Sequence, residues 1–225
     1  MSAGNGSGGN LTLTKPTGTA DGDLLRIVVY FEPDTTTISI TGGFTEGEVL
    51  ANTGAFKLQE FYKLAASEPA SYTISNDTAG NQWRTAVGAA YSGGTGSGTW
   101  KDVSAASQAD GAIATGQTSP SVTTTGVDRL LGWSYGNFSG ADGDTTPVGA
   151  VTVARGWLGG VSLGDAARAS AGATGTTHPD AGAIGTETYV GIHVAYISDI
   201  AGGRTTKNTR SAPLGVNIGM DWRSG

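Results

Sequence analysis

Imidazole and carboxylate groups would have to carry most of the chemistry in this chain, which has two histidines and no cysteine. His178 stands in the turn-like stretch "TTHPD", where Asp180 is the only nearby candidate ligand. A metal site would need further ligands at suitable spacing. His193 stands in "ETYVGIHVAYI" without the serine or carboxylate partner that a catalytic base would have. We interpret both histidines as structural, and we expect no catalytic, cofactor-binding or metal-binding residue.

The carboxylates form one repeated pattern, "ADGD", which occurs at residues 20–23 and again at 141–144. Two aspartates flanking a glycine, Asp21 with Asp23 and Asp142 with Asp144, could contribute to a calcium site. Neither copy is followed by the other oxygen ligands or the bidentate glutamate of a complete calcium loop. Asp-Gly is also common in tight turns. We interpret both copies as turns.

Two tryptophans, Trp100 and Trp222, lie outside the apolar face of any expected strand. Either could stack on a sugar or pack against a neighbouring subunit, and packing is the favoured interpretation. Trp100 ends the glycine-rich stretch "YSGGTGSGTW" at residues 91–100. That stretch lacks the following helix and the Lys-Ser/Thr pair of a phosphate-binding loop, so we expect a loop tip there.

The composition narrows the class of protein. The net charge is −6, and 14% of the residues are charged against about 25% in ordinary domains. An acidic chain with scattered basic residues is a poor nucleic-acid binder, because phosphates require a basic patch. No apolar run approaches the about 20 residues of a membrane span, and we see no secretory signal at the N-terminus. We therefore expect neither nucleic acid nor membrane as a partner.

Short alternating segments separated by Gly, Pro, Asp and Asn predict an all-β protein. The stretch "DLLRIVVYF" (23–31) is apolar on both faces, with Arg26 inserted in one. We expect a loop at 101–113 and one helical turn within 163–173. Residues 56–65 form a further expected strand. One aligned face is expected for each of four other stretches: 82–93 (Trp83, Val87, Ala89, Tyr91), 128–138 (Leu131, Trp133, Tyr135), 150–164 (Val151, Val153, Trp157, Val161, Leu163) and 187–197 (Val190, Ile192, Val194, Tyr196). His193 is expected on the opposite face of the last of these. We predict an antiparallel β-sandwich of jelly-roll type as a single domain over residues 11–225. A flexible Gly-rich arm over residues 1–10 precedes it.

Three phrases carry a resemblance to a known family: "LTLTKPTGTADGDLL" (11–25), "FYKLAASEPASYTIS" (61–75) and "AVGAAYSGG" (86–94). In this order they resemble a β-sandwich domain of tailed-bacteriophage virion proteins, with a match over residues 11–95. Phe44 stands where that family has a "P-x-G-W" phrase, so the packing of residues 36–55 stays open. We interpret "EPASYTIS" (68–75) as scaffold, because Pro69 favours an extended start and Tyr72 and Ile74 share a face.

The resemblance implies a non-enzymatic structural protein of the virion. Such a protein decorates the capsid or attaches to the tail through contacts with other virion proteins, as a homo-oligomer. The alternative that it leaves open is a receptor- or carbohydrate-binding module at the tail tip, with a host surface glycan as its ligand.

Overall fold

The fold is all-β. The computed structural model of the chain describes residues 10–34, 37–52, 56–77, 84–92, 100–109, 120–137, 153–158, 161–175 and 189–197. Within these ranges the chain forms strands, turns and bends but no helix, and every strand pairing is antiparallel. The predicted fold class of antiparallel sheets is therefore confirmed.

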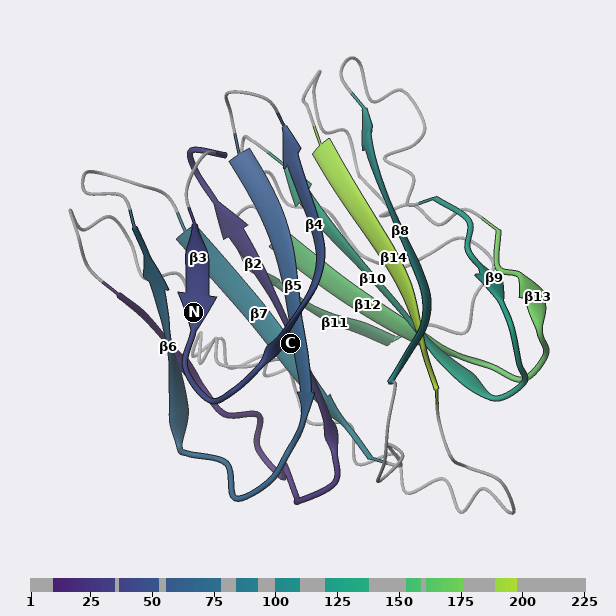
Figure 1. Ribbon diagram of the computed structural model, residues 1–225, viewed down its shortest axis with the longest axis horizontal. Helices are drawn as coiled ribbons and strands as arrows, with labels where there is room; N and C mark the ends of the chain where they lie inside the picture. Colours follow the sequence, from purple (N-terminus) through teal and green to yellow (C-terminus); the bar gives the residue numbers. More distant parts are fainter. Residues whose placement is uncertain are drawn as a thin grey trace, which may run out of the picture.

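The strands of the described residues form four sheets (Figure 1). The three-stranded sheet has the order β1-β6-β3, with bounds Leu11–Thr14, Ser71–Asn76 and Ile38–Ile40. The four-stranded sheet has the order β4-β5-β2-β7, with bounds Thr45–Asn52, Phe56–Leu64, Leu24–Phe31 and Arg84–Tyr91.

The second half of the described chain builds the other two sheets. The five-stranded sheet has the order β11-β12-β10-β14-β8, with bounds Val153–Leu158, Val161–Arg168, Arg129–Asn137, Tyr189–Ile197 and Lys101–Ala109. The two-stranded sheet pairs β13 with β9, with bounds Gly172–Ala173 and Thr123–Thr124. In Figure 1 the three-stranded, four-stranded and five-stranded sheets follow one another from left to right.

The four-stranded sheet is the middle layer, and β2 at its centre explains why. All eight residues of β2 are buried, as the sequence predicted for 23–31. Leu25, Ile27, Val29 and Phe31 pack with β1, β3 and β6 of the three-stranded sheet. The alternate residues Val28 and Tyr30 pack with Val161, Leu163 and Ile192 of the five-stranded sheet. A strand that is apolar on both faces can bury both of them only between two other layers.

Three predicted faces of other strands are also confirmed. Val87, Ala89 and Tyr91 of β7 face the five-stranded sheet. Leu131, Trp133 and Tyr135 of β10 share the outer face of that sheet. Ile192, Val194 and Tyr196 of β14 are buried on its inner face. In each case the two-residue period of a strand was sufficient to group the side chains.

Three predictions of local structure are wrong. Residues 101–109 of the expected loop 101–113 form the strand β8. The small polar side chains of β8 do not predict a strand, but its backbone pairs with β14. The expected helical turn within 163–173 is replaced by β12, which pairs on both sides with β10 and β11. Residues 150–164 do not share one aligned face, since β11 and β12 are separate antiparallel strands of a hairpin. Pairing with neighbouring strands outweighs weak local preferences in all three.

The jelly-roll connectivity is not confirmed. A jelly roll is wound from two Greek keys across two sheets. Here all strands of the four-stranded sheet precede all strands of the five-stranded sheet in the sequence. The arm at residues 1–10 lies outside the described residues except for Asn10.

Phe44 occupies the position where the family resemblance would place a tryptophan. Its ring meets that of Tyr72 edge-on, with centroids 5.1 Å apart, and Lys63 Nζ lies 5.4 Å from the Phe44 centroid. Phe44 thus packs at the margin of the first core layer. Gly42, with φ at +100°, precedes it in a conformation that other residues rarely adopt.

Candidate functional site

The most unusual group of side chains is a buried ion pair in the layer between the four-stranded and five-stranded sheets. Arg26 of β2 and Glu60 of β5 are both fully buried, and Arg26 Nε donates to Glu60 Oε1 at 2.5 Å. Each stands in a strand at a position that alternation assigns to the five-stranded sheet, beside Val28 and Leu58 respectively. The pair therefore points into the middle of the protein.

Residues of the five-stranded sheet add further hydrogen bonds to this pair, while Glu60 Oε2 has no partner among the described residues. Tyr196 of β14 donates its hydroxyl to Glu60 Oε1 at 2.6 Å. The Arg26 guanidinium donates to the carbonyl oxygen of Trp133 at 3.3 Å and to Ser134 Oγ at 3.4 Å, both in β10. We call Arg26, Glu60, Ser134 and Tyr196 the central polar cluster. It connects two strands of one sheet to two strands of the other.

Burial and the negative charge of Glu60 act in opposite directions on the pKa of Arg26 and in the same direction on the pKa of Tyr196. Burial lowers the pKa of Arg26, but the negative charge of Glu60 and its hydrogen bond to the guanidinium outweigh burial and raise that pKa above its ordinary value. For Tyr196, burial and then the negative charge of Glu60 raise the pKa well above its ordinary value. Both effects keep Arg26 charged and Tyr196 protonated at neutral pH, which preserves the donor set around the carboxylate.

Two glycines provide the space that the central polar cluster occupies. A Cβ atom on Gly132 of β10 would lie 3.0 Å from the guanidinium carbon of Arg26. A Cβ atom on Gly47 would lie 2.6 Å from Glu60 Oε2. Gly47 lies where the register of β4 against β5 shifts, between Glu46 and Val49. The irregular strand and the missing side chain leave room for a buried carboxylate.

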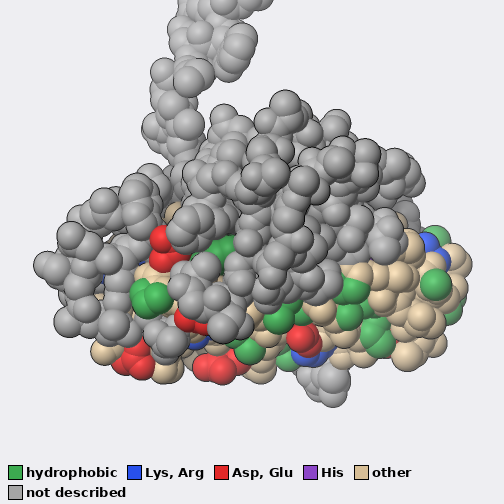
Figure 2. Space-filling view, turned by 90° about the horizontal axis from the view of Figure 1, so that it is seen from above, with side chains coloured by type: hydrophobic (Ala, Val, Ile, Leu, Met, Phe, Trp, Pro, Cys, Tyr) green, Lys and Arg blue, Asp and Glu red, His purple; other side chains and the backbone are tan. Residues whose placement is uncertain are grey.

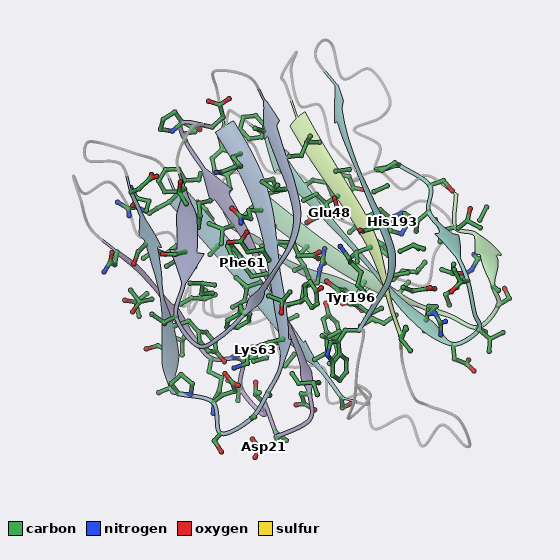
Figure 3. All side chains as sticks on the ribbon, viewed as in Figure 1. Asp21, Glu48, Phe61, Lys63, His193 and Tyr196 are labelled. Atoms are coloured by element: carbon green, nitrogen blue, oxygen red, sulfur yellow. The ribbon has the colours of Figure 1, made fainter. Side chains whose placement is uncertain are left out.

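Other polar contacts cross the same layer on both sides of the central polar cluster. Tyr91 of β7 donates to Asp165 Oδ2 of β12 at 3.5 Å. At the opposite side, Glu48 of β4 accepts from Ser104 and from Lys101 of β8, with Lys101 Nζ at 3.3 Å. Figure 3 shows Glu48 and Tyr196 in the region between the two sheets. Hydrogen-bonded groups thus follow the interface from one side to the other.

His193 belongs to the opposite face of the five-stranded sheet, as its alternation with Ile192 and Val194 predicted (Figure 3). It is fully buried, with Nδ1 2.9 Å from the carbonyl oxygen of Pro120. Its ring is perpendicular to that of Trp133, with centroids 6.0 Å apart. The imidazole thus bonds to a backbone carbonyl and packs against an indole.

The first Asp-Gly-Asp stretch forms the turn that the sequence predicted. Asp23 Oδ2 accepts from the backbone N–H of Ala20 at 2.8 Å, and Asp21 Oδ1 accepts from that of Ser67 at 2.7 Å. Gly22 between them has φ at +90°, the left-handed region that glycine tolerates. The two carboxylates therefore hold this turn and the neighbouring loop together. His178, Asp142, Asp144 and Trp222 lie outside the described residues.

Trp100 is not free on a loop tip, which corrects the sequence interpretation. Its side chain is partly buried and packs against Leu24, Val194 and Tyr196 of its own chain. Its carbonyl oxygen accepts from Ile197 N–H at 2.7 Å. Within the described residues, the tryptophan that was considered for sugar stacking thus contributes to the core.

The "EPASYTIS" stretch also behaves as scaffold. Glu68 accepts from Tyr72 Oη at 2.9 Å and from Ala66 N–H at 2.9 Å, and it pairs with Lys63 Nζ at 2.7 Å. Partial burial would raise the pKa of Glu68, but these bonds outweigh it and lower that pKa. The carboxylate closes the turn between β5 and β6, and Tyr72 and Ile74 are buried on one face as predicted.

No arrangement of three or more His, Cys, Asp or Glu side chains that could hold a metal ion occurs within the described ranges. That part of the chain also contains no helix long and apolar enough to cross a membrane. Comparisons with protein-family models, with curated proteins and with solved structures each found no match.

Sequence reasoning identified the strands of the central polar cluster but not the cluster. The charge of Arg26 within an apolar strand was the only sign of the cluster in the sequence. Glu60 stands 34 positions away and Tyr196 another 136 positions beyond Glu60, so their approach depends on sheet packing rather than on spacing. A charged residue in the middle of an otherwise buried strand is itself the clue to a buried partner.

Proposed function

We propose that this chain is a non-enzymatic structural protein on the surface of a tailed-bacteriophage virion. It would decorate the capsid or attach to the tail through contacts with other virion proteins, as a homo-oligomer. The order of the three resembling phrases over residues 11–95 is the origin of the phage assignment. The burial of several ionisable side chains supports the non-enzymatic part of the proposal.

The observation that carries the structural role is the location of the ionisable groups. Arg26, Glu60 and Asp165 are buried between the four-stranded and five-stranded sheets, where they bond to neighbouring strands, and His193 is buried on the other face of the five-stranded sheet, where it bonds to the Pro120 carbonyl. An enzyme places such groups where a substrate can reach them. The central polar cluster could meet a substrate only if the two sheets separated. Its contacts favour holding the layers together.

The surface agrees with a role in assembly. In Figure 2, uncharged polar side chains and backbone predominate among the described residues, with charged groups scattered between apolar ones. Only 14% of the chain is charged. A surface with few charges has little ionic repulsion to oppose close packing with other proteins. Trp100, which a sugar-binding module would need on its surface, is packed inward.

The test is to locate the protein on intact particles. An antibody against the purified chain should label virions released from cells that carry the gene, and quantitative mass spectrometry should give many copies per particle. Particles made without the gene supply the control for labelling and the comparison for host adsorption.

Two results would contradict the proposal. Absence of the chain from purified particles would exclude a virion protein. A deletion that leaves particle assembly and stability unchanged while host adsorption collapses would replace the structural role with receptor or glycan binding at the tail tip.

A further inference from the structure

Two short segments lie over part of the outer face of the five-stranded sheet. Residues 120–125 contain β9 and residues 171–175 contain β13, and the two strands pair with each other. Val122 is buried against Leu131, Trp133, Tyr135, Ala166 and Ala195. We call these two segments the outer flap. Figure 1 shows β9 and β13 at the right, beyond the large sheets.

The outer flap is bonded within itself and attached to the sheet by ionisable side chains. Within it, Thr174 N–H donates to the Val122 carbonyl at 2.9 Å, and Val122 N–H donates to Thr174 Oγ1 at 3.1 Å. From the sheet, Asp102 Oδ2 accepts from Thr125 N–H at 3.0 Å, and Arg168 Nη2 donates to the Ala173 carbonyl at 2.8 Å. His193 provides the attachment at the start of the flap, through Pro120.

The geometry of His193 suits only the neutral imidazole. Nδ1–H donates to the Pro120 carbonyl, whereas Nε2 is buried and has no hydrogen-bond partner among the described residues. Protonation would place a second N–H at the buried Nε2, where no acceptor lies among the described residues, and a full charge on the ring. A buried donor without an acceptor, and above all a buried charge, is strongly unfavourable.

The charges around His193 add to this effect. Arg26 approaches from the other face of the sheet, beneath Gly132, which is the β10 residue beside Trp133. Burial lowers the pKa of His193 to about 4; the Pro120 bond opposes that shift and the positive charge of Arg26 adds to it. On the flap side, Asp102 bonds to Thr125 and Arg129, Arg168 bonds to the Ala173 carbonyl, and Asp128 lies directly before β10 with its backbone N–H bonded to the Ala169 carbonyl. Ala105 of β8 and Trp133 of β10, the strand neighbours of His193, carry no charge.

We propose that the outer flap is an acid-released cover, in which protonation of His193 places an unpaired N–H and a charge beneath the flap, and the hydration of that charge opens the flap and exposes the apolar face of β10. The flap opens before the sheets separate because its strands are two residues long, and local openings of weakly attached elements cost less than global unfolding. The surface that it uncovers includes Leu131, Trp133 and Tyr135. An exposed aromatic patch of this kind is suited to new protein contacts. This inference stands independently of the proposed function.

The test uses the absence of native cysteine, which makes an introduced thiol unique. Ala166→Cys places the thiol beneath the outer flap, and Ala90→Cys places it in the layer between the three-stranded and four-stranded sheets. Both alanines are 3% exposed, so the two variants are matched in burial. The thiols are labelled with 4,4′-dithiodipyridine from pH 7 to pH 4, and each rate is divided by that of the urea-unfolded variant at the same pH.

If His193 has its ordinary pKa in the open form and a pKa of about 4 in the closed form, acidification from pH 7 to pH 4 raises the opening constant about a hundredfold. We expect Ala166→Cys to show that increase and Ala90→Cys to stay protected. Adding His193→Gln, a neutral side chain that retains a donor, should abolish the increase. Adding His178→Gln, which removes the other histidine, should leave it unchanged.

Three outcomes would overturn the proposal. Continued protection of Ala166→Cys at pH 4 would show that the flap does not open. Labelling of both thiols together would show global unfolding. An increase that persists with His193→Gln and disappears with Asp102→Asn would assign the effect to the carboxylate. Should His193→Gln not fold, the profile of Ala166→Cys alone decides, because opening by His193 begins below about pH 6.5 and opening by carboxylates only below about pH 4.5.

Discussion

Removing one member of the Arg26–Glu60 pair should destabilise the protein far more than removing both. Glu60→Gln leaves a fully buried guanidinium without its counter-ion, and Arg26→Met leaves a fully buried carboxylate. Breaking a buried pair from one side costs about 3–5 kcal/mol, whereas replacing both partners with neutral groups is often close to neutral. We therefore expect each single variant to lose about 3–5 kcal/mol of unfolding free energy, and Arg26→Met/Glu60→Gln to lose less than either.

Urea unfolding followed by tryptophan fluorescence measures these differences, and thermal unfolding provides a second readout. For a chain of this size, about 1 kcal/mol corresponds to about 2–4 °C, so each single variant should melt about 6–20 °C below the wild type. Lys101→Met is the matched control, because Lys101 also forms an ion pair across this layer, with Glu48, but at partly exposed side chains. Its expected cost is below about 1 kcal/mol.

Two results would refute this reasoning. If Glu60→Gln costs no more than Lys101→Met, then the carboxylate is not the counter-ion of a dry guanidinium. If the double variant costs the sum of the two single variants, then the two side chains act independently and the central polar cluster does not depend on their pairing.

Three further perturbations have definite expected results. The pKa of His193 is lowered to about 4 in the folded state, whereas the unfolded chain has the ordinary value. The free energy of unfolding should therefore fall by about 3 kcal/mol as the pH drops from about 6.5 to 4. Urea unfolding of the wild type and of His193→Gln at each pH measures the contribution of His193 as the difference between the two proteins. Gly164→Ala should destabilise by about 1–3 kcal/mol, since a Cβ there would collide with the indole of Trp133; a wild-type melting temperature would contradict that packing. Trp100→Ala should lower the free energy of unfolding by about 2–4 kcal/mol, because its ring packs against the core. An unchanged free energy of unfolding would contradict this packing.

The sequence predicted strands and faces well where alternation was strong. β2 and β10 carry large apolar residues at every second position over much of their length, and their faces follow from that period alone. The predictions were wrong where side chains were small. β8 and the end of β12 are rich in Ala and Ser, which do not mark a face, so partner strands determine their conformation. Those partners lie up to about a hundred residues away, and no local pattern encodes them.

The candidate site was harder to predict than the strands for the same reason. Alternation placed His193 on the opposite face from Ile192 and Val194, which is right, but it could not tell that residues 120–125 lie over that face. Trp100 was assigned to a loop because its neighbours in sequence are glycines, and its packing partners are Leu24 and Tyr196. A face is a local property of a strand, whereas burial depends on what covers the face.

The contacts between the sheets bear on how many units this chain forms. The four-stranded sheet comes from residues 24–91, and the five-stranded sheet from residues 101–197. Without the second sheet, the first would expose Val28, Tyr30 and Leu58 together with the Arg26–Glu60 pair. Without the first sheet, the second would lose the acceptor of the Tyr196 hydroxyl. Apolar surface and bonding groups are thus complementary between the halves, which favours one cooperative domain over two independent ones.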